Sequence, residues 1–356
     1  MNEVPLGGGF IGTQVGARLE KRSLSLTPPL PDKLSIEINN SCNHACFFCP
    51  NPTMTRQRRV MDDATIERVM RQGYDAGIRQ VSFYSTGEPF LNKKLPDYVR
   101  RAKQLGYTYV YLSTNGGRQV SRRLRPVLEA GLDSLKFSIN AGDRETYALV
   151  HGEDDFDEVM ANVRLVSDYR RTVRPMKLFV SFVETPLSNH SFGSLQAAVG
   201  DLVDEVVRYP FIVIGTPLKH RVVDGVERPF IGYGDVDRGE TLNRLRTTLP
   251  CYQLWSYLNV TVEGYLSACC SDFNNDLVVG NLNRTSLLEA WHSAEFRALR
   301  QRHVERKIAG TLCHGCIAQR ELPSEPLNAH LFDAPEARPA KGAAVAPARG
   351  ESRSGG

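Results

Sequence analysis

The chain has 356 residues, of which 41% are hydrophobic, so it can bury a substantial core in one large domain and a smaller one. Its formal net charge is only +4 and the basic residues are spread along the chain, which argues against nucleic-acid binding. The sequence has neither an apolar run of about 18 residues nor a recognisable signal peptide, so we expect a cytoplasmic protein that does not bind membranes.

Six strand patterns alternate with helix patterns between residues 34 and 210. Strands are indicated by alternating apolar and polar residues, and helices by apolar residues at a spacing of three and four. The predicted strands begin at Leu34, Ile78, Tyr107, Leu132, Met176 and Val203. This order indicates an α/β fold in which a parallel sheet curves into a partial (β/α)6 barrel related to the TIM barrel. The chemistry of such folds lies at the C-terminal ends of the strands.

The remainder of the chain divides into four further segments. Residues 1–33 form an N-terminal extension, and residues 211–250 are a connection rich in glycine, proline and charge. Residues 251–320 predict a small module, made of a β-hairpin that turns at Glu263–Gly264 and one amphipathic helix over SLLEAWHSAEFRALRQRHVER. Residues 321–356 are of low complexity, which predicts a disordered tail.

The eight cysteines fall into two separate groups. Cys42, Cys46 and Cys49 follow the first predicted strand with the spacing CxxxCxxC, and the others lie beyond residue 250. Thiols stay reduced in the cytoplasm, so both groups predict metal binding rather than disulfides. Three thiolates are one too few for a tetrahedral zinc site, but they suit an iron–sulfur cube with one iron left open. A zinc knuckle is the alternative interpretation.

The CxxxCxxC loop after the first strand of a βα barrel resembles the radical S-adenosylmethionine (SAM) superfamily, and Phe48 matches the aromatic residue that lies beside the adenine there. The resemblance implies that Cys42, Cys46 and Cys49 hold a [4Fe–4S] cluster whose open iron binds SAM. It also implies that an electron from this cluster cleaves SAM, and that the resulting deoxyadenosyl radical abstracts hydrogen from a substrate. We therefore expect an external one-electron reductant such as flavodoxin or ferredoxin.

The same resemblance assigns SAM contacts to residues at the ends of the second, third and fourth strands. Thr86, Gly87 and Glu88 match the Gly-Gly-Glu motif that holds the SAM amino group, with threonine in place of the first glycine. Further contacts, to the SAM ribose and carboxylate, are assigned to Asn115, Ser138, Asn140 and His151. His151 stands where the family often has an arginine, so the carboxylate partner stays open. For both asparagines a turn-forming role is the alternative.

The second cysteine group resembles the C-terminal SPASM/twitch extension found in that superfamily. A hairpin and a CxxC turn supply four thiolates for an auxiliary [4Fe–4S] cluster, namely Cys251, Cys269, Cys313 and Cys316. Because no cysteine follows Cys316, the twitch form with one auxiliary cluster fits better than the full form with two. Taken alone, this group also fits a zinc ribbon. Cys270 is left over and is interpreted as a bystander, a replacement for Cys269 or a hydrogen-atom donor.

The resemblance implies a radical SAM oxidoreductase that abstracts hydrogen from a small polar substrate, such as a sugar, an aminocyclitol or a nucleoside. Dehydrogenation is preferred, as in 2-deoxy-scyllo-inosamine dehydrogenase and related enzymes of antibiotic biosynthesis. The alternatives are a sugar epimerase, a peptide or protein maturase, and a non-catalytic zinc scaffold. Only about 33 residues precede the first strand, which is short for a leader-peptide-binding domain and disfavours peptide maturation.

Candidate catalytic residues are less well defined than the cofactor contacts. Glu184 lies at the end of the fifth strand, Arg208 lies near the sixth strand, and Cys270 adjoins the auxiliary ligands, so these three are candidates for acid–base or hydrogen-donor roles. A structural role at the barrel rim is the alternative for Glu184 and Arg208. His44 is expected to face solvent or cap the cysteine loop, and the basic run RQRR at residues 56–59 is expected to be solvated.

Overall fold

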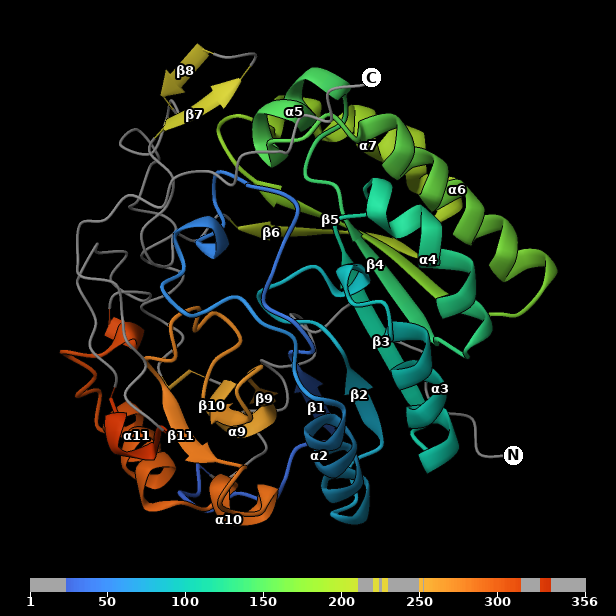
Figure 1. Ribbon diagram of the computed structural model, residues 1–356. Helices are drawn as coiled ribbons and strands as arrows, with labels where there is room; N and C mark the ends of the chain where they lie inside the picture. The colour runs from blue at the N-terminus through green and yellow to red at the C-terminus, as the bar shows by residue number, and fades with distance from the viewer. Residues whose placement is uncertain are drawn as a thin grey trace, which may run out of the picture.

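The computed structural model describes residues 24–210, 220–223, 226–229, 250–251, 253–314 and 327–333. Nine strands form one sheet in the order β11-β10-β9-β1-β2-β3-β4-β5-β6, and helices cover the outer face of its β1–β6 part (Figure 1). The strands of this sheet are β1 (Lys33–Ile36), β2 (Gln80–Ser82), β3 (Tyr109–Thr114), β4 (Ser134–Ser138), β5 (Lys177–Glu184), β6 (Glu205–Pro210), β9 (Leu258–Val260), β10 (Tyr265–Ser267) and β11 (Val278–Asn281). A separate hairpin pairs β7 (His220–Val223) with β8 (Val226–Pro229) inside the predicted connection.

Strands β1 to β6 are parallel and pair in sequence order, which confirms the predicted partial barrel. The sheet is not closed, because β6 and β11 are its two edges within the described residues. The connecting helices are α2 (Asp63–Asp75), α3 (Leu95–Leu105), α4 (Arg118–Glu129), α5 (Arg144–His151), α6 (Phe156–Thr172) and α7 (Phe192–Val199). Short 3-10 helices are η1 (Asn51–Thr53), η2 (Pro89–Leu91), η3 (Asn189–Ser191) and η4 (Gly200–Leu202).

Helix α5 is an element that the sequence analysis does not predict. It has only eight residues. Asp143 caps its start by accepting a hydrogen bond from the Thr146 backbone N at 2.8 Å, and Gly152 ends it in the left-handed region with a φ of 82°. The helix matters for the site because it ends at His151, directly beneath the cysteine loop.

Side chains of the barrel strands alternate between a dry outer face and an accessible inner face. Leu112 and Leu135 point outward beneath the helices and are at most 1% exposed. Ser113, Lys136 and Ser138 occupy alternate positions of the same strands, point inward and stay partly exposed. A parallel strand that is buried on both faces is nearly all apolar, so this alternation marks the inner face as polar, with Ser113, Lys136 and Ser138 among its partly exposed residues.

The strands of the C-terminal module continue the barrel sheet. β9 pairs in parallel with β1, with Leu34 opposite Leu258, and β10 and β11 follow as an antiparallel extension. The predicted turn at Glu263–Gly264 is confirmed, and Gly264 adopts a φ of +84° that favours glycine. The sequence analysis predicts neither β11 nor the pairing with β1. This pairing satisfies backbone groups of β1 that a free sheet edge would leave unpaired.

The helix predicted after the hairpin is in fact two helices, α10 (Leu287–Trp291) and α11 (Ala294–Val304). Ser286 caps α10 in a capping box, and Ser293 caps α11 by accepting a hydrogen bond from the Phe296 backbone N at 3.1 Å. The second serine cap begins a new helix and so interrupts the predicted one.

Arg300 fixes α11 against the short helix α9 (Gln253–Ser256). Its side chain is fully buried, with Nε donating to the Leu254 carbonyl at 3.0 Å and Nη1 donating to the Trp291 carbonyl at 2.9 Å. The guanidinium also lies 3.7 Å from the ring centroid of Phe296. Because α9 follows Cys251 directly, this contact also positions one of the predicted auxiliary ligands.

Part of the predicted disordered tail is ordered. Residues 327–333 contain η5 (Ala329–Leu331), and the Asn281 side-chain amide at the end of β11 donates to the Leu331 carbonyl at 2.8 Å. This bond, together with those from the Leu327 backbone N to the Asp276 carbonyl and from the Asn328 side chain to the Val278 carbonyl, holds this stretch, despite its low-complexity surroundings. The rest of the predicted tail and residues 1–23 lie outside the described residues. Among the described helices, none combines the length and apolar composition of a membrane-spanning segment.

Candidate cluster and cofactor sites

The loop that carries the first cysteine group is fixed to the end of α5. The Ala45 backbone N donates to the His151 carbonyl at 3.0 Å, and the Phe47 backbone N donates to the Val150 carbonyl at 3.1 Å. Phe48, the residue predicted beside the adenine, is half-buried, with its ring centroid 5.5 Å from that of Phe47. These contacts hold the loop at the C-terminal rim of the barrel, where the sequence analysis expects it.

The thiols of Cys42 and Cys49 fit an iron site. Burial, with a further contribution from the Glu88 carboxylate, raises the pKa of Cys42 to about 12, and burial raises the pKa of Cys49 to about 11. A thiolate in these positions needs a compensating cation, which iron supplies in place of the proton. The backbone N–H groups of His44 and Asn51 donate to these two sulfurs at 3.4 and 3.5 Å. Such donors are typical around iron–sulfur thiolates.

Glu88 is buried at the rim with its carboxylate oriented by three protein donors. Oε1 accepts hydrogen bonds from Thr114 Oγ1 at 2.8 Å and from the Phe90 backbone N at 3.1 Å. Oε2 accepts one from the Asn115 backbone N at 2.7 Å. Because a carboxylate oxygen can accept two hydrogen bonds, Oε2 retains a position that suits an ammonium group.

Gly87 and Thr86 sit where the second strand meets the cysteine loop. A Cβ on Gly87 would lie 2.6 Å from the carbonyl oxygens of both Asn39 and Ser41, so only glycine permits this approach. The hydroxyl and backbone N of Thr86 donate to the Glu37 carboxylate at the end of β1. The threonine of the predicted motif is therefore anchored to the first strand.

The two asparagines predicted at the strand ends have different surroundings. The Asn115 side-chain amide donates to Asn43 Oδ1 at 3.0 Å and lies 4.0 Å from Cys42 Sγ, so it borders the first cysteine group. Asn140 has a φ of 55°, and its Oδ1 accepts a hydrogen bond from the Val183 backbone N at 2.9 Å. Asn140 thus has the geometry of the turn-forming alternative.

His151 and His44 are buried beneath the cysteine loop. His151 Nε2 lies 2.7 Å from the Ile139 carbonyl, and its Nδ1 lies 3.3 Å from Cys46 Sγ and 3.4 Å from His44 Nδ1. His44 is 4% exposed and its Nε2 lies 3.5 Å from Asp155. The expectation that His44 faces solvent is therefore wrong. Both ring nitrogens of His151 face protein atoms, so its surroundings differ from those expected of a partner for the SAM carboxylate.

Glu184 and Arg208 lie on the helix-facing side of the sheet. Glu184 lies two residues after the buried Phe182 on β5, so the two side chains point to the same side of the sheet. The Glu184 carboxylate pairs with the Arg208 guanidinium. That guanidinium lies 4.4 Å from the ring centroid of Phe192 in α7. Alternation along the strands directs both side chains outward, and their ion pair agrees with a structural role at the barrel rim, while a catalytic role stays a prediction.

The inner face of the barrel carries polar side chains that the sequence analysis does not single out. Lys136 on β4 has its Nζ 5.2 Å from the ring centroid of Tyr209 on β6. The predicted SAM contact Ser138, two residues further along β4, has its Oγ 3.4 Å from the hydroxyls of both Ser113 and Ser181. The sequence signal that could have identified these inner-face residues is the occurrence of polar residues at every second position of a parallel strand.

Cys270 of the C-terminal module reaches the same inner face. Burial lowers the pKa of Lys136 to about 8, and the Cys270 thiolate opposes this shift. A hydrogen bond with Cys269, together with a smaller effect of the Lys136 charge, lowers the pKa of Cys270 to about 7. Burial raises the pKa of Tyr84 and of Tyr257, and the negative charge of Cys270 adds to both shifts. Electrostatic interactions thus link the Cys270 thiol to Lys136 on the inner face.

One arginine of the RQRR run is buried, contrary to expectation. Arg56 is 5% exposed, and its guanidinium pairs with the carboxylates of Glu37 and Glu263. Two carboxylates compensate its charge, which is the condition for burying an arginine. We call these three residues the Arg56 triad.

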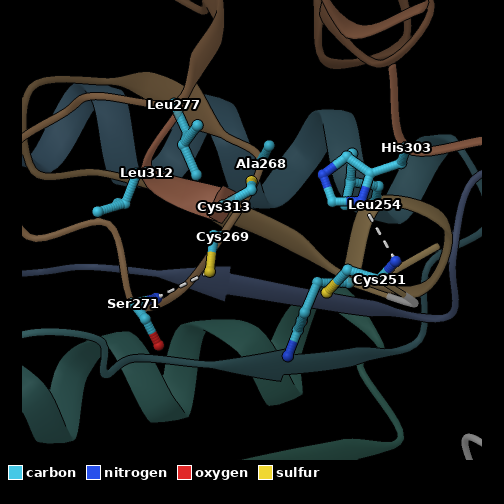
Figure 2. A pocket seen from close by; sticks show the side chains of 10 residues that line it. Cys251, Leu254, Ala268, Cys269, Ser271, Leu277, His303, Leu312 and Cys313 are labelled. Atoms are coloured by element: carbon cyan, nitrogen blue, oxygen red, sulfur yellow. Dashed lines mark hydrogen bonds between the residues drawn. The ribbon is translucent and has the colours of Figure 1, made fainter. Parts of the chain in front are cut away.

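Three of the four predicted auxiliary ligands line one pocket (Figure 2). The pocket is lined by Cys251, Cys269 and Cys313 together with Gln253, Leu254, Ala268, Ser271, Leu277, His303 and Leu312. Burial raises the pKa of Cys251 to about 11, and the Ser271 backbone N donates to Cys269 Sγ at 3.3 Å. This largely apolar, thiol-lined space fits an iron–sulfur cluster. The fourth predicted ligand, Cys316, lies outside the described residues.

Two protein-family models match the chain. One describes the radical SAM superfamily and covers residues 36–181, and the other describes the SPASM iron–sulfur cluster-binding domain and covers residues 251–317. A probable GTP 3',8-cyclase from Saccharolobus islandicus is 34% identical over 142 residues, which are 39% of this chain and 44% of the cyclase. The chain therefore spans less than half the length of that relative.

Solved structures share the fold at low sequence identity. BtrN in complex with AdoMet and 2-DOIA has a TM-score of 0.51 at 20% identity, covering 82% of this chain and 96% of BtrN. Streptococcus suis SuiB bound to the precursor peptide SuiA has a TM-score of 0.59 at 15% identity, covering 81% of this chain and 70% of SuiB.

Proposed function

We propose that this chain, a radical SAM enzyme with a C-terminal SPASM domain, dehydrogenates a small polar substrate at a carbon that bears a hydroxyl group. Its domains imply SAM and two [4Fe–4S] clusters, which supply hydrogen-atom abstraction and one-electron transfer when bound. The first cluster would be held by Cys42, Cys46 and Cys49. The second would be held by Cys251, Cys269, Cys313 and Cys316.

The observation that carries this proposal is the polar inner face of the barrel. Lys136 and Ser138 of β4 are partly exposed there. The negative charge of the Cys270 thiolate, from the C-terminal module, favours the protonated form of Lys136. A substrate on this face would have the SAM site at the barrel rim and the auxiliary pocket behind Cys270. The serine and tyrosine hydroxyls offer both hydrogen-bond donors and acceptors, which suits a polyhydroxylated substrate.

Lys136 is the proton acceptor in this proposal. Burial lowers its pKa to about 8, so roughly a tenth of the amines are neutral at pH 7. When the substrate carbon has lost a hydrogen atom, its hydroxyl gives a proton to the lone pair of Lys136 Nζ. The remaining species would be a strong reductant, and the auxiliary cluster held by the C-terminal cysteines would supply the acceptor for its electron, which leaves a ketone. One hydrogen atom, one proton and one electron thus leave the substrate.

The rim residues orient SAM in this proposal. Oε2 of Glu88 accepts a hydrogen bond from the SAM ammonium group, and Asn115 borders the same position beside Cys42. Thr114 and Phe90 keep the Glu88 carboxylate in place, so its orientation does not depend on SAM. An external flavodoxin or ferredoxin delivers the electron, and the protein works in the cytoplasm.

Anaerobic turnover tests the proposal with 2-deoxy-scyllo-inosamine as the probe, dithionite as reductant and SAM in excess. We expect one molecule of 5'-deoxyadenosine for each molecule of ketone. Incorporation of solvent deuterium at one carbon without net oxidation would instead show epimerisation. Formation of 5'-deoxyadenosine with no change in the probe would exclude this substrate.

A nucleotide is the second candidate substrate. The relative named as a probable GTP 3',8-cyclase suggests it, and the positive charge of Lys136 on the inner face would attract a phosphate group. GTP is therefore the second probe in the same assay, and consumption of GTP with SAM cleavage would favour this candidate. A peptide is a further possibility, because SuiB, which shares the fold, was solved with its precursor peptide.

A further inference from the structure

His303 lies in the wall of the auxiliary pocket with a defined role for each ring nitrogen. It stands near the end of α11, is 0% exposed, and faces the space shared by Cys251, Cys269 and Cys313 (Figure 2). The Cys251 backbone N donates to His303 Nδ1 at 3.3 Å. Nδ1 is therefore an acceptor without a proton, and the ring proton is on Nε2.

The His303 Nε2–H group is a buried donor that has no hydrogen-bond partner among the residues the structure describes. Figure 2 shows this nitrogen on the side of the ring that faces Ala268 and Cys313, away from the bond to Cys251. Buried N–H groups are rarely left unpaired in native proteins. The lining consists mostly of apolar side chains and thiols, with Gln253 and Ser271 as its polar members, and neither of these two accepts a hydrogen bond from Nε2. An occupant of the pocket can therefore supply the acceptor.

We propose that His303 Nε2–H donates a hydrogen bond to a sulfur of the auxiliary [4Fe–4S] cluster and so raises its reduction potential. Reduction adds negative charge to the cluster, and a donor stabilises the more negative state more strongly. His303 is a positioning residue in this role, because it acts on the cluster and not on the substrate. The proposal requires the auxiliary cluster but is independent of which substrate the enzyme oxidises.

The alternative role for His303 is direct coordination of iron. A histidine that ligates through Nε2 carries its remaining proton on Nδ1. Here Nδ1 accepts a hydrogen bond from the Cys251 backbone N at 3.3 Å. A proton on Nδ1 would place two hydrogen-bond donors opposite each other and abolish this bond. The geometry therefore favours a hydrogen-bond donor and leaves the fourth ligand position to Cys316.

A redox titration followed by electron paramagnetic resonance tests the proposal on the reconstituted full-length protein. The auxiliary signal is the one that added SAM does not change, and the SAM-sensitive signal serves as an internal reference. His303→Phe keeps the ring volume but removes the donor. At a fixed potential we expect its ratio of reduced to oxidised auxiliary cluster to fall about tenfold, which is about 59 mV for a one-electron couple. His303→Gln restores a donor and should recover most of the shift.

Controls separate this effect from packing and from ligation. Leu277→Met changes an apolar residue of the same pocket without removing a donor, and a shift as large as that of His303→Phe would attribute the effect to packing and overturn the proposal. An unchanged potential in His303→Phe overturns the proposal. Loss of about half the iron in that variant, with unchanged circular dichroism, would identify His303 as a ligand and also overturns it.

A measurement on the parent protein covers the case in which His303→Phe does not fold. After labelling with [15N]histidine, electron spin-echo spectroscopy of the reduced auxiliary cluster should show a weak nitrogen coupling, as expected for a hydrogen-bonded ring. A strong coupling, as expected for direct ligation, contradicts the proposal. Absence of any coupling contradicts it equally.

Discussion

Arg56 in the cysteine loop donates two hydrogen bonds to Glu263 at the turn of the β9–β10 hairpin, with donor–acceptor distances of 3.0 Å from Nε and 2.8 Å from Nη2. Glu37 at the end of β1 pairs with the same guanidinium and accepts hydrogen bonds from Thr86 and from the Val262 backbone N. The Arg56 triad thereby joins the cysteine loop, the predicted SAM motif and the C-terminal module.

Replacing Arg56 by methionine should destabilise the protein strongly. The change leaves the buried Glu37 and Glu263 carboxylates without a cation, and breaking a buried ion pair in this way costs about 3–5 kcal/mol. We expect a lower Tm by circular dichroism and less iron retained after reconstitution. Arg59→Met is the matched control, because the Arg59 guanidinium only donates to Gln57 at the surface. Equal losses in both variants would contradict a special role for the triad.

The contribution of Glu263 should depend on pH in the acid range. Burial opposes its ionisation, but the Arg56 charge outweighs burial and holds the pKa of Glu263 below its ordinary value. A carboxyl group whose pKa is lower in the folded state stabilises the fold at pH values above its unfolded-state pKa of about 4.3. It loses that effect as the pH falls through its folded-state pKa.

Urea unfolding of the parent and of Glu263→Gln between pH 3 and pH 7 measures this contribution. The difference in unfolding free energy between the two proteins should be largest near neutral pH and should shrink toward pH 3. A difference that stays constant over this range would show that the Glu263 charge contributes nothing to folding.

Glu88→Gln should reduce SAM cleavage about 10–100-fold, because in our proposal the Glu88 carboxylate accepts a hydrogen bond from the SAM ammonium, and a hydrogen bond to a charged group contributes about 1.5–3 kcal/mol. The assay is 5'-deoxyadenosine formed under reducing conditions without substrate. Glu184→Gln is the control, since Glu184 also ends a barrel strand but pairs with Arg208 on the outer side. Similar activity of both variants would remove Glu88 from the SAM site.

Lys136→Arg should retain SAM cleavage but lose oxidised product by about 10²–10⁴-fold, because arginine keeps the charge but cannot accept the proton. The probe is 2-deoxy-scyllo-inosamine, and both products are quantified in one reaction. The control is Lys177→Met on β5, because Lys177 is paired with Asp204 at 2.9 Å. Product formation by Lys136→Arg at the parent rate would show that Lys136 only supplies charge.

Local sequence patterns predicted the features that depend on neighbouring residues. The strand and helix order of the barrel follows from periodicity, and the hairpin turn follows from Gly264, whose positive φ excludes most other residues. The cysteine spacings also predicted the two groups, and the structure gathers Cys251, Cys269 and Cys313 around one pocket. Each of these features is encoded within a few residues of the chain.

Features that depend on distant residues were not predicted. The pairing of β9 with β1 joins segments more than 200 residues apart, and Arg56 is buried only because Glu37 and Glu263 come from two other segments. Glu184 was named as a catalytic candidate from its place at the end of β5, although alternation along the strand directs its side chain outward. The same alternation of side chains, applied to β4, would have identified Lys136 as an inner-face residue.

The iron content of three full-length proteins tests most directly that this chain holds two separate iron–sulfur cubes. After anaerobic reconstitution we expect about eight irons per chain in the parent, from two cubes of four. We expect about four in Cys42→Ala/Cys46→Ala/Cys49→Ala, and about four in Cys251→Ala/Cys313→Ala, provided that circular dichroism shows both variants folded. Stoichiometric zinc without iron–sulfur absorbance in the parent, or loss of all iron from either folded variant, would contradict two independent clusters.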